Sequence, residues 1–147
     1  GAEAAPEFER TLEAVASLAA RLSREGGAVG LRANGSLEGG GAPFVPLGGG
    51  PHQLPAILEV LARLSAAPGP SLRETLRAGL RLPWGISCLC FARSWRGSAP
   101  AFLRYLADRH VPALLFVSQP LRCEETEGDT PATVRPLASI LAQEGEP

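Results

Sequence analysis

The sequence predicts an α/β fold of three layers, in which helices cover both faces of a mostly parallel sheet. Two strongly apolar runs, residues 85–91 and 111–117, are typical of strands that are buried on both faces. Amphipathic helical patterns alternate with these runs, as they do around a parallel sheet. The 147 residues, 45% of them hydrophobic, suffice for one core, so we expect residues 1–147 to form a single domain or a domain fragment.

The first half of the chain predicts two helices and two short strands between them. Apolar residues at helical spacing indicate the helices, and alternating or apolar runs bounded by glycines indicate the strands. Pro46 in the second run is typical of an edge strand. The expected elements are a helix over residues 7–25 that ends at Gly26-Gly27, strands over residues 28–33 and 44–47, and a helix over residues 53–65.

The second half predicts a βαβ pattern after a third helix. Ser71 and Glu74 form a capping box, which indicates a helix start. The run over residues 85–91 is so apolar that we expect a central parallel strand. The expected elements are a helix over residues 71–80, a strand over 85–91, a helix after Ser98, a strand over 111–117, an irregular polar segment over 121–133, and a helical turn or two over 136–143.

Charge and composition argue against several classes of function. The 14 basic residues, all arginine, against 15 acidic ones give a net charge of −1, which disfavours nucleic-acid binding. No apolar run reaches the roughly 18 residues of a membrane span. The three cysteines lack the spacing of a disulfide framework, so we expect a reducing, cytoplasmic location. The chain lacks Met, and we interpret residues 1–6 as a tag or the cut edge of a longer protein.

Catalytic and metal-binding patterns are missing from the sequence, so we expect no enzyme activity, cofactor or metal. His52 and His110 have no Cys, His or carboxylate at metal-ligand spacing. Cys88 and Cys90 lie in an apolar run and are interpreted as small buried hydrophobic residues.

One alternative stays open. Gly48, Gly49 and Gly50 connect a strand to a helix, as phosphate-binding loops do, although Pro51-His52 rather than Lys-Ser follows them. The alternative function is a small α/β nucleotide- or phosphate-handling enzyme that uses the Gly48–Gly50 loop.

The candidate interaction surface begins where the apolar strand over residues 85–91 ends. Arg93, Trp95 and Arg96 follow this strand at its carboxyl end, where open α/β sheets place their sites. Trp84 precedes the strand at its other end. Both tryptophans are expected to cap the core, whereas an exposed tryptophan would be a candidate interface anchor.

A second candidate surface lies on the predicted third helix. Arg73 and Arg77, followed by Arg81, recur every four residues and therefore share one helix face. Such a face suits docking to an acidic partner, although a solvated face is the commoner meaning of the pattern.

Three stretches of the sequence form a recognisable series. The helix segment FERTLEAVASLA, from Phe8 to Ala19, leads into GGAVGL at residues 26–31, and a Gly-rich hairpin follows. PHQL at residues 51–54 then opens a Leu-rich helix. These stretches resemble the C-terminal part of the MoxR-associated proteins called domain of unknown function 58. The resemblance covers residues 7–117 and concerns the pattern of helices and strands rather than catalytic signatures.

The resemblance implies a von Willebrand factor A-like, or more broadly Rossmann-like, fold. It implies a parent protein with N-terminal membrane helices, a cytoplasmic soluble part, and no membrane contact by the present segment. It also implies a non-enzymatic protein-interaction module that works with a MoxR-type AAA+ ATPase in the assembly or maturation of other proteins.

Two departures from that fold matter. Metal-binding relatives carry Asp-x-Ser-x-Ser after the first strand and a further Asp after a later one, but here Ala92, Arg93 and Ser94 follow the strand. The first strand, central in this fold, would lie just before Phe8, so we expect the chain to lack it. The strand at Val29 would then pair with the one at Ile86, or a strand would be borrowed from a neighbouring molecule. An open sheet edge favours a homo-oligomer.

Overall fold

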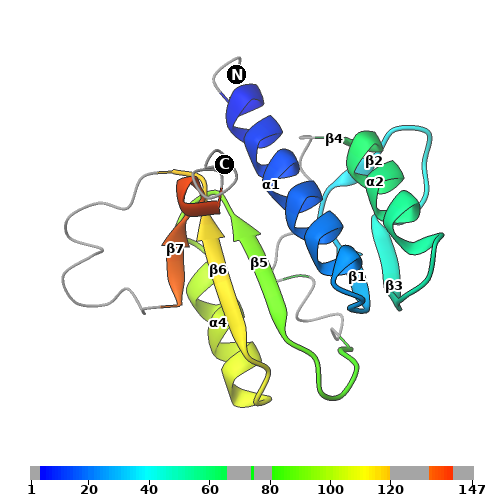
Figure 1. Ribbon diagram of the computed structural model, residues 1–147. Helices are drawn as coiled ribbons and strands as arrows, with labels where there is room; N and C mark the ends of the chain where they lie inside the picture. The colour runs from blue at the N-terminus through cyan, green and yellow to red at the C-terminus, as the bar shows by residue number, and fades with distance from the viewer. Residues whose placement is uncertain (1–3, 66–73, 75–80, 120–132, 141–147) are drawn as a thin grey trace. The chain divides into compact units, whose positions relative to one another are not determined.

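The computed structural model describes residues 4–65, 74, 81–119 and 133–140, and the chain divides into two compact units, Gly1–Ser71 and Leu72–Pro147 (Figure 1). Each unit contains strand pairs of its own. The single domain expected from the chain length therefore stays a prediction. None of the described helices combines the length and the apolar character of a membrane-spanning segment.

The first unit contains two helices and two small antiparallel sheets. Its first helix packs against its second, and both contact the β1–β3 pair. The elements are α1 Ala4–Arg24, β1 Val29–Arg32, β2 Ser36–Leu37, β3 Phe44–Gly48, α2 Gln53–Arg63 and β4 Leu64–Ser65, with β1 paired to β3 and β2 to β4.

The end of α1 is formed by the two glycines that the sequence predicts as its stop. The Gly27 N–H donates to the Leu22 carbonyl at 3.0 Å, and the Gly26 N–H donates to the Ser23 carbonyl at 3.1 Å. Gly26 has φ +84°, a left-handed conformation that glycine adopts at little cost. These bonds form a Schellman motif, which satisfies the last helical carbonyls and turns the chain into β1.

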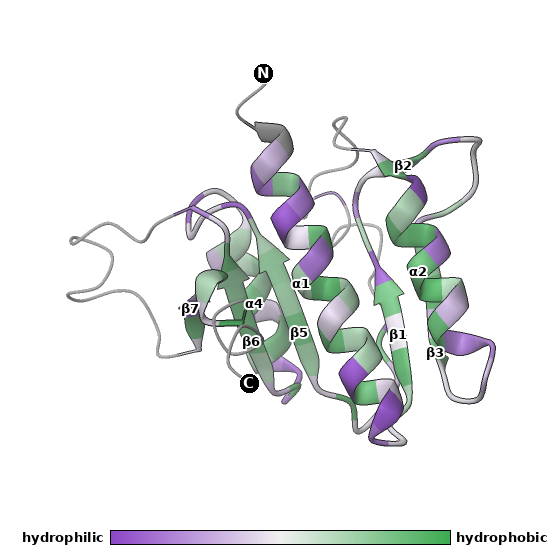
Figure 2. Ribbon diagram, turned by 45° about the horizontal axis from the view of Figure 1, so that its top comes forward, coloured by the Kyte–Doolittle hydropathy of each residue, from purple (hydrophilic) through white to green (hydrophobic). Residues whose placement is uncertain are grey.

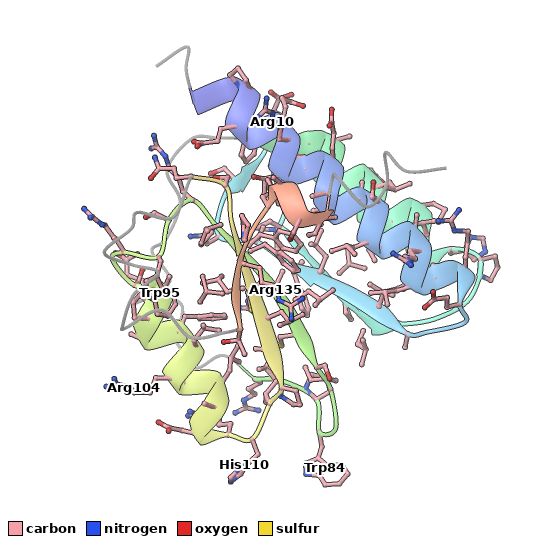
Figure 3. The ribbon with its side chains drawn as sticks, turned by 60° about the vertical axis from the view of Figure 1, so that its left-hand side comes forward. Arg10, Trp84, Trp95, Arg104, His110 and Arg135 are labelled. Carbon is pink, nitrogen blue, oxygen red and sulfur yellow. The ribbon has the colours of Figure 1, made fainter. Side chains whose placement is uncertain are left out.

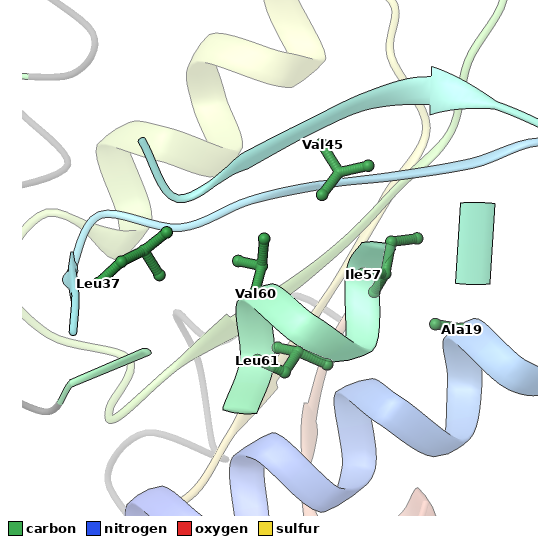
Figure 4. Packing of buried hydrophobic residues seen from close by; sticks show 6 residues of the cluster. All are labelled: Ala19, Leu37, Val45, Ile57, Val60 and Leu61. Atoms are coloured by element: carbon green, nitrogen blue, oxygen red, sulfur yellow. The ribbon is translucent and has the colours of Figure 1, made fainter. Parts of the chain in front are cut away.

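The core of the first unit lies between the two helices and the strands (Figure 4). Purple polar and green apolar residues alternate along α1 in Figure 2, as an amphipathic helix requires. The buried residues of this cluster are Ala19, Leu37, Val45, Ile57, Val60 and Leu61.

The structure confirms the two strands predicted for this unit and corrects the end of its second helix. The strands expected over residues 28–33 and 44–47 pair antiparallel as β1 and β3. The expected pairing of the Val29 strand with the strand at Ile86 stays a prediction, because it would join the two units. The second helix ends at Arg63 rather than at residue 65, because Leu64 and Ser65 are extended and pair with β2.

The second unit is built on a three-stranded parallel sheet. Its strands are β5 Cys88–Ala92, β6 Ala113–Val117 and β7 Val134–Pro136, in the order β5-β6-β7, and the helix α4 Ala99–Asp108 packs against β6. A further helical turn covers residues 138–140. The predicted α/β class is thereby confirmed at the level of a parallel sheet flanked by helices.

The hydrogen-bond ladder between β5 and β6 is regular. The Cys88 N–H donates to the Pro112 carbonyl at 2.8 Å, and the Ala92 carbonyl accepts from the Ser118 N–H at 3.1 Å. In a parallel ladder alternate residues of a strand bond to the same neighbour. Within β5, Cys88, Cys90 and Ala92 are therefore the residues whose backbone groups face β6.

Two expectations for the second half need correction, and two others concern residues that lie almost wholly outside the described part of the chain. Among the described residues of the second unit, the strand over residues 85–91 is not central, since β5 lies at one edge of the β5-β6-β7 sheet and Leu89 is 40% exposed. The central strand is β6, whose Leu115, Phe116 and Val117 are buried. Residues 134–136 form β7 because they pair in parallel with β6, whereas the sequence predicts no element for residues 134 and 135 and helix for Pro136. The helix over residues 71–80 and the polar segment over 121–133 lie outside the described residues, except Glu74, which is helical, and Thr133.

Candidate interaction surface

Arg93 stands at the carboxyl end of the parallel sheet, where the sequence predicts an interaction site. Its carbonyl accepts hydrogen bonds from the Gln119 N–H at 2.8 Å and from the Ser118 hydroxyl at 3.4 Å. These bonds tie the backbone after β5 to the residues after β6, while the Arg93 side chain is exposed. Arg96, also exposed, follows in the turn before α4. The sheet thus presents both arginines on one short connecting segment.

Trp95 lies between these arginines but packs inward. Its half-buried ring contacts the hydrophobic cluster that contains Ala99, Leu115, Val117 and Val134 (Figure 3). Trp95 therefore caps the core of the second unit, as one of the two sequence-based interpretations holds. Its contribution to an interaction surface stays a prediction.

Trp84, unlike Trp95, does not cap the core, so the first interpretation is wrong for this residue. It is 100% exposed and projects from the turn at residues 84–85, close to the start of β5 (Figure 3). Gly85 follows with φ +80°, so the turn uses a conformation that glycine favours. The sequence does carry a signal for this exposure, because Trp84 stands between Pro83 and Gly85, the residues that mark turns.

The end of α4 lies, like Trp84, at the amino-terminal end of the parallel sheet, and it carries the exposed residues Arg109 and His110. The Val111 N–H donates to the Leu106 carbonyl at 3.0 Å, and His110 adopts φ +56° in the left-handed region. His110 is thus the left-handed residue that follows the C-cap Arg109 and closes the end of α4. The Arg109 guanidinium carbon lies 3.4 Å from the centroid of the Tyr105 ring, a cation–π contact that orders an exposed positive charge.

The Gly48–Gly50 loop has a structural use that competes with phosphate binding. The Gln53 N–H, at the start of α2, donates to the Gly50 carbonyl at 3.3 Å. Pro55, two residues later, has no N–H to offer. Few helix N-terminal donors therefore remain for an anion, and His52 makes no side-chain capping hydrogen bond.

The other Gly-rich stretch, residues 39–41, is held by Arg63 of α2. The Arg63 guanidinium donates to the Glu38 carbonyl at 2.9 Å and to the Gly40 carbonyl. It also lies 3.7 Å from the Glu59 carboxylate, one turn earlier on the helix. Arg63 thus holds the loop between β2 and β3 in place. The sequence alone does not indicate these contacts of Arg63.

Burial lowers the reactivity of the two cysteine thiols in β5. Burial raises the pKa of the Cys90 thiol to about 12, with a smaller contribution from Cys88, and burial also raises the pKa of Cys88. Cys90 contacts the cluster beside α4. Thiols with raised pKa values are poor nucleophiles near neutral pH.

The remaining predicted site residues belong to the arginine series of the expected third helix. Arg73 and Arg77 lie outside the described residues, and Arg81 is exposed. Among residues 4–65, 74, 81–119 and 133–140, no group of three or more His, Cys, Asp or Glu side chains could hold a metal ion.

Comparisons with known proteins add no relative to this description. The chain matches no protein-family model, no curated protein and no solved structure.

Proposed function

We propose that the chain is a non-enzymatic protein-interaction module, built on a von Willebrand A-like variant of the α/β fold. In this proposal it belongs to a larger membrane-anchored protein, lies on the cytoplasmic side, and works with a MoxR-type AAA+ ATPase in the assembly or maturation of other proteins. The sequence resemblance over residues 7–117 and the parallel sheet of the second unit support the proposal.

The observation that carries the proposal is the full exposure of Trp84. Every other aromatic side chain that the structure describes in this unit is at least partly covered, namely Phe91, Trp95, Phe102, Tyr105 and Phe116. Covering an exposed aromatic ring with a partner surface lowers the free energy of the system. Tryptophan is also enriched among the residues that dominate interface energetics. Trp84 is therefore the anchor of the proposed docking surface.

Charged residues near Trp84 suggest the chemistry of the partner. Arg81, three residues before Trp84 in the chain, is exposed, and so are Asp108, Arg109 and His110 around the end of α4. This mixture favours a partner surface with an apolar pocket for the indole and acidic groups around it. Arg93 and Arg96 form the second, predicted contact region at the other end of the sheet.

The test measures binding of the purified 147-residue chain to a purified MoxR-type AAA+ ATPase from the same organism, by biolayer interferometry. We expect Trp84→Ala to raise Kd by about tenfold or more, since anchor residues at interfaces contribute about 2 kcal/mol or more. Charge reversal at Arg93 and Arg96 should weaken binding less, and Arg104→Glu, on the exposed side of α4, serves as the control.

Two results would count against the proposal. One is an ATPase that does not bind the chain, or binds Trp84→Ala as well as the unchanged protein. The other is a rise in melting temperature with a nucleotide that disappears in His52→Ala, which would favour the enzyme alternative at the Gly48–Gly50 loop.

A further inference from the structure

The loop of residues 38–41, which follows β2 in the first unit, bends around the guanidinium of Arg63. The Arg63 Nε donates to the Glu38 carbonyl at 2.9 Å, and its Nη2 donates to the Gly40 carbonyl. The backbone between these carbonyls is equally close, since a Cβ atom at Gly39 would lie 3.4 Å from the same Nη2. The side chain of one cation thus holds both halves of the loop.

Three successive glycines give the loop the shape that this contact requires. Gly39, Gly40 and Gly41 have φ values of +87°, +86° and +101°, in a region that residues with a side chain rarely adopt. The Gly40 N–H also donates to the Leu37 carbonyl at 3.1 Å. Glycine loses more conformational entropy than any other residue when its backbone is ordered. The contacts of the Arg63 side chain therefore act against a large entropy gain on release of the loop.

The base of the loop is bonded to the backbone of the same arginine. The Glu38 N–H donates to the Arg63 carbonyl at 2.8 Å, next to the antiparallel pair of Leu37 and Leu64. The ion pair of Arg63 with Glu59, at 3.7 Å, joins side chains that are 37% and 70% exposed, and exposed pairs contribute little to stability. The guanidinium therefore acts on the loop mainly through the two carbonyls that it binds.

We propose that residues 38–41 form a strap with a closed and an open state, and that the guanidinium of Arg63 keeps the strap closed. The strap opens by a local motion while the helices and the β1–β3 pair of the first unit stay folded. The closed strap lies against the core, since a Cβ at Gly41 would be 3.9 Å from the Leu37 side chain. Opening exposes two groups at once, the apolar side chain of Leu37 and the positive charge of Arg63. This proposal is independent of the docking role of Trp84.

The first test uses a protease that cleaves after glutamate, because the bond between Glu38 and Gly39 lies inside the strap. A closed strap resists cleavage, so the rate reports the population of the open state. In native digestion of the 147-residue chain, followed by mass spectrometry, we expect Arg63→Ala to raise the initial rate at Glu38 by about tenfold or more. Arg21→Ala is the matched control, since Arg21 also pairs with a glutamate one turn away on its helix, at 3.8 Å.

Cleavage after Glu13, on an exposed position of α1, measures global unfolding in the same digest. The rate at Glu13 should be equal in the unchanged chain and in Arg63→Ala, because the strap opens without the helices. Two results would overturn the proposal. One is an unchanged rate at Glu38 in Arg63→Ala, and the other is a rate at Glu38 that rises in step with the rate at Glu13.

A second measurement needs no variant, so it decides the matter even if Arg63→Ala fails to fold. In native-state hydrogen exchange of the unchanged chain, low concentrations of urea should leave the exchange rates of the Glu38 and Gly40 amides unaltered, because a local opening exposes little surface. The amide of Val60, a buried residue of α2, should exchange faster with each increment of urea. A Glu38 amide whose exchange depends on urea as steeply as that of Val60 would show that the strap opens only with the whole unit, against the proposal.

Discussion

The aromatic ring of Phe91 in β5 stacks on that of Phe116 in β6, with ring centroids 5.4 Å apart and an angle of 25° between the planes. The two residues are direct partners in the parallel register. Phe116 is 7% exposed, so the ring that stacks on Phe91 is itself buried. The contact joins the edge strand to the central strand by side chains as well as by backbone bonds.

Truncating this contact should destabilise the protein strongly. Phe116→Ala should lower the free energy of unfolding by about 3–5 kcal/mol, because it removes buried area and leaves a cavity. Phe44→Ala is the control, since Phe44 is 47% exposed and its ring contacts the Arg32 guanidinium, at 5.3 Å. We expect that control to cost about 1 kcal/mol or less. Urea denaturation measures both; equal losses would contradict the assigned burial.

Gly30 is a position in β1 where a side chain has no room. A Cβ atom there would lie 2.9 Å from the Leu47 nitrogen and 2.9 Å from the Val45 oxygen, both backbone atoms of β3. Gly30→Ala should therefore cost about 1–3 kcal/mol, the usual range for overpacking. Gly49→Ala meets nothing within 4 Å and should change stability by less than about 0.5 kcal/mol. Thermal unfolding of the two variants provides the comparison, and a neutral Gly30→Ala would show that the two strands lie further apart.

Gln53 holds the hairpin to α2 through its side-chain amide. Its Nε2 donates to the Val29 carbonyl of β1 and, at 2.7 Å, to the Pro46 carbonyl of β3. Gln53→Glu replaces the donor with a carboxylate that repels both carbonyls at pH 7, and we expect a loss of about 1–3 kcal/mol. His52→Ala, at the exposed neighbouring position, should be close to neutral in the same chemical denaturation experiment. Comparable losses in both variants would argue against the bridging role of Gln53.

The thiols of β5 predict a pH dependence of stability and reactivity. The pKa of Cys90 is about 12 in the folded chain against 9.0 for an unperturbed thiol. The unfolded chain therefore releases its proton at lower pH, so the stabilisation is complete below about pH 9 and is lost as pH rises toward 12.

Cys90→Ala should accordingly flatten the decline of stability above pH 9 that denaturation of the unchanged chain shows. In alkylation followed by peptide mass mapping at pH 8, Cys90 should react more slowly than Cys88, whose thiol is less deeply buried. Faster reaction at Cys90 would contradict the deeper burial of its thiol.

Local features of the fold were predictable from sequence because neighbouring residues determine them. Gly26 and Gly27 end α1 by hydrogen bonds within one turn, and the β1–β3 hairpin joins strands close in the chain. The apolar run of β6 likewise indicates a buried strand in its correct place.

Features that depend on distant partners were not predictable in this way. The same apolar character that places β6 at the centre of its sheet also occurs in β5, which lies at the edge, since hydropathy reports burial and not the number of neighbouring strands. Residues 134–136 form β7 only because β6 offers a free edge. Pro83 and Gly85 mark a turn at Trp84, but whether other residues cover a side chain in that turn depends on segments distant in the sequence.

The measurement that tests the docking role of Trp84 most directly is ¹⁹F NMR of the chain labelled with 5-fluorotryptophan. The protein contains two tryptophans, so one resonance reports the exposed Trp84 and the other the packed Trp95, and Trp84→Phe assigns them. On titration with the purified MoxR-type AAA+ ATPase, we predict that the Trp84 resonance shifts or broadens to saturation, while that of Trp95 changes little. A Trp84 resonance that stays unchanged while the ATPase binds, or when no binding occurs, would contradict the proposed function.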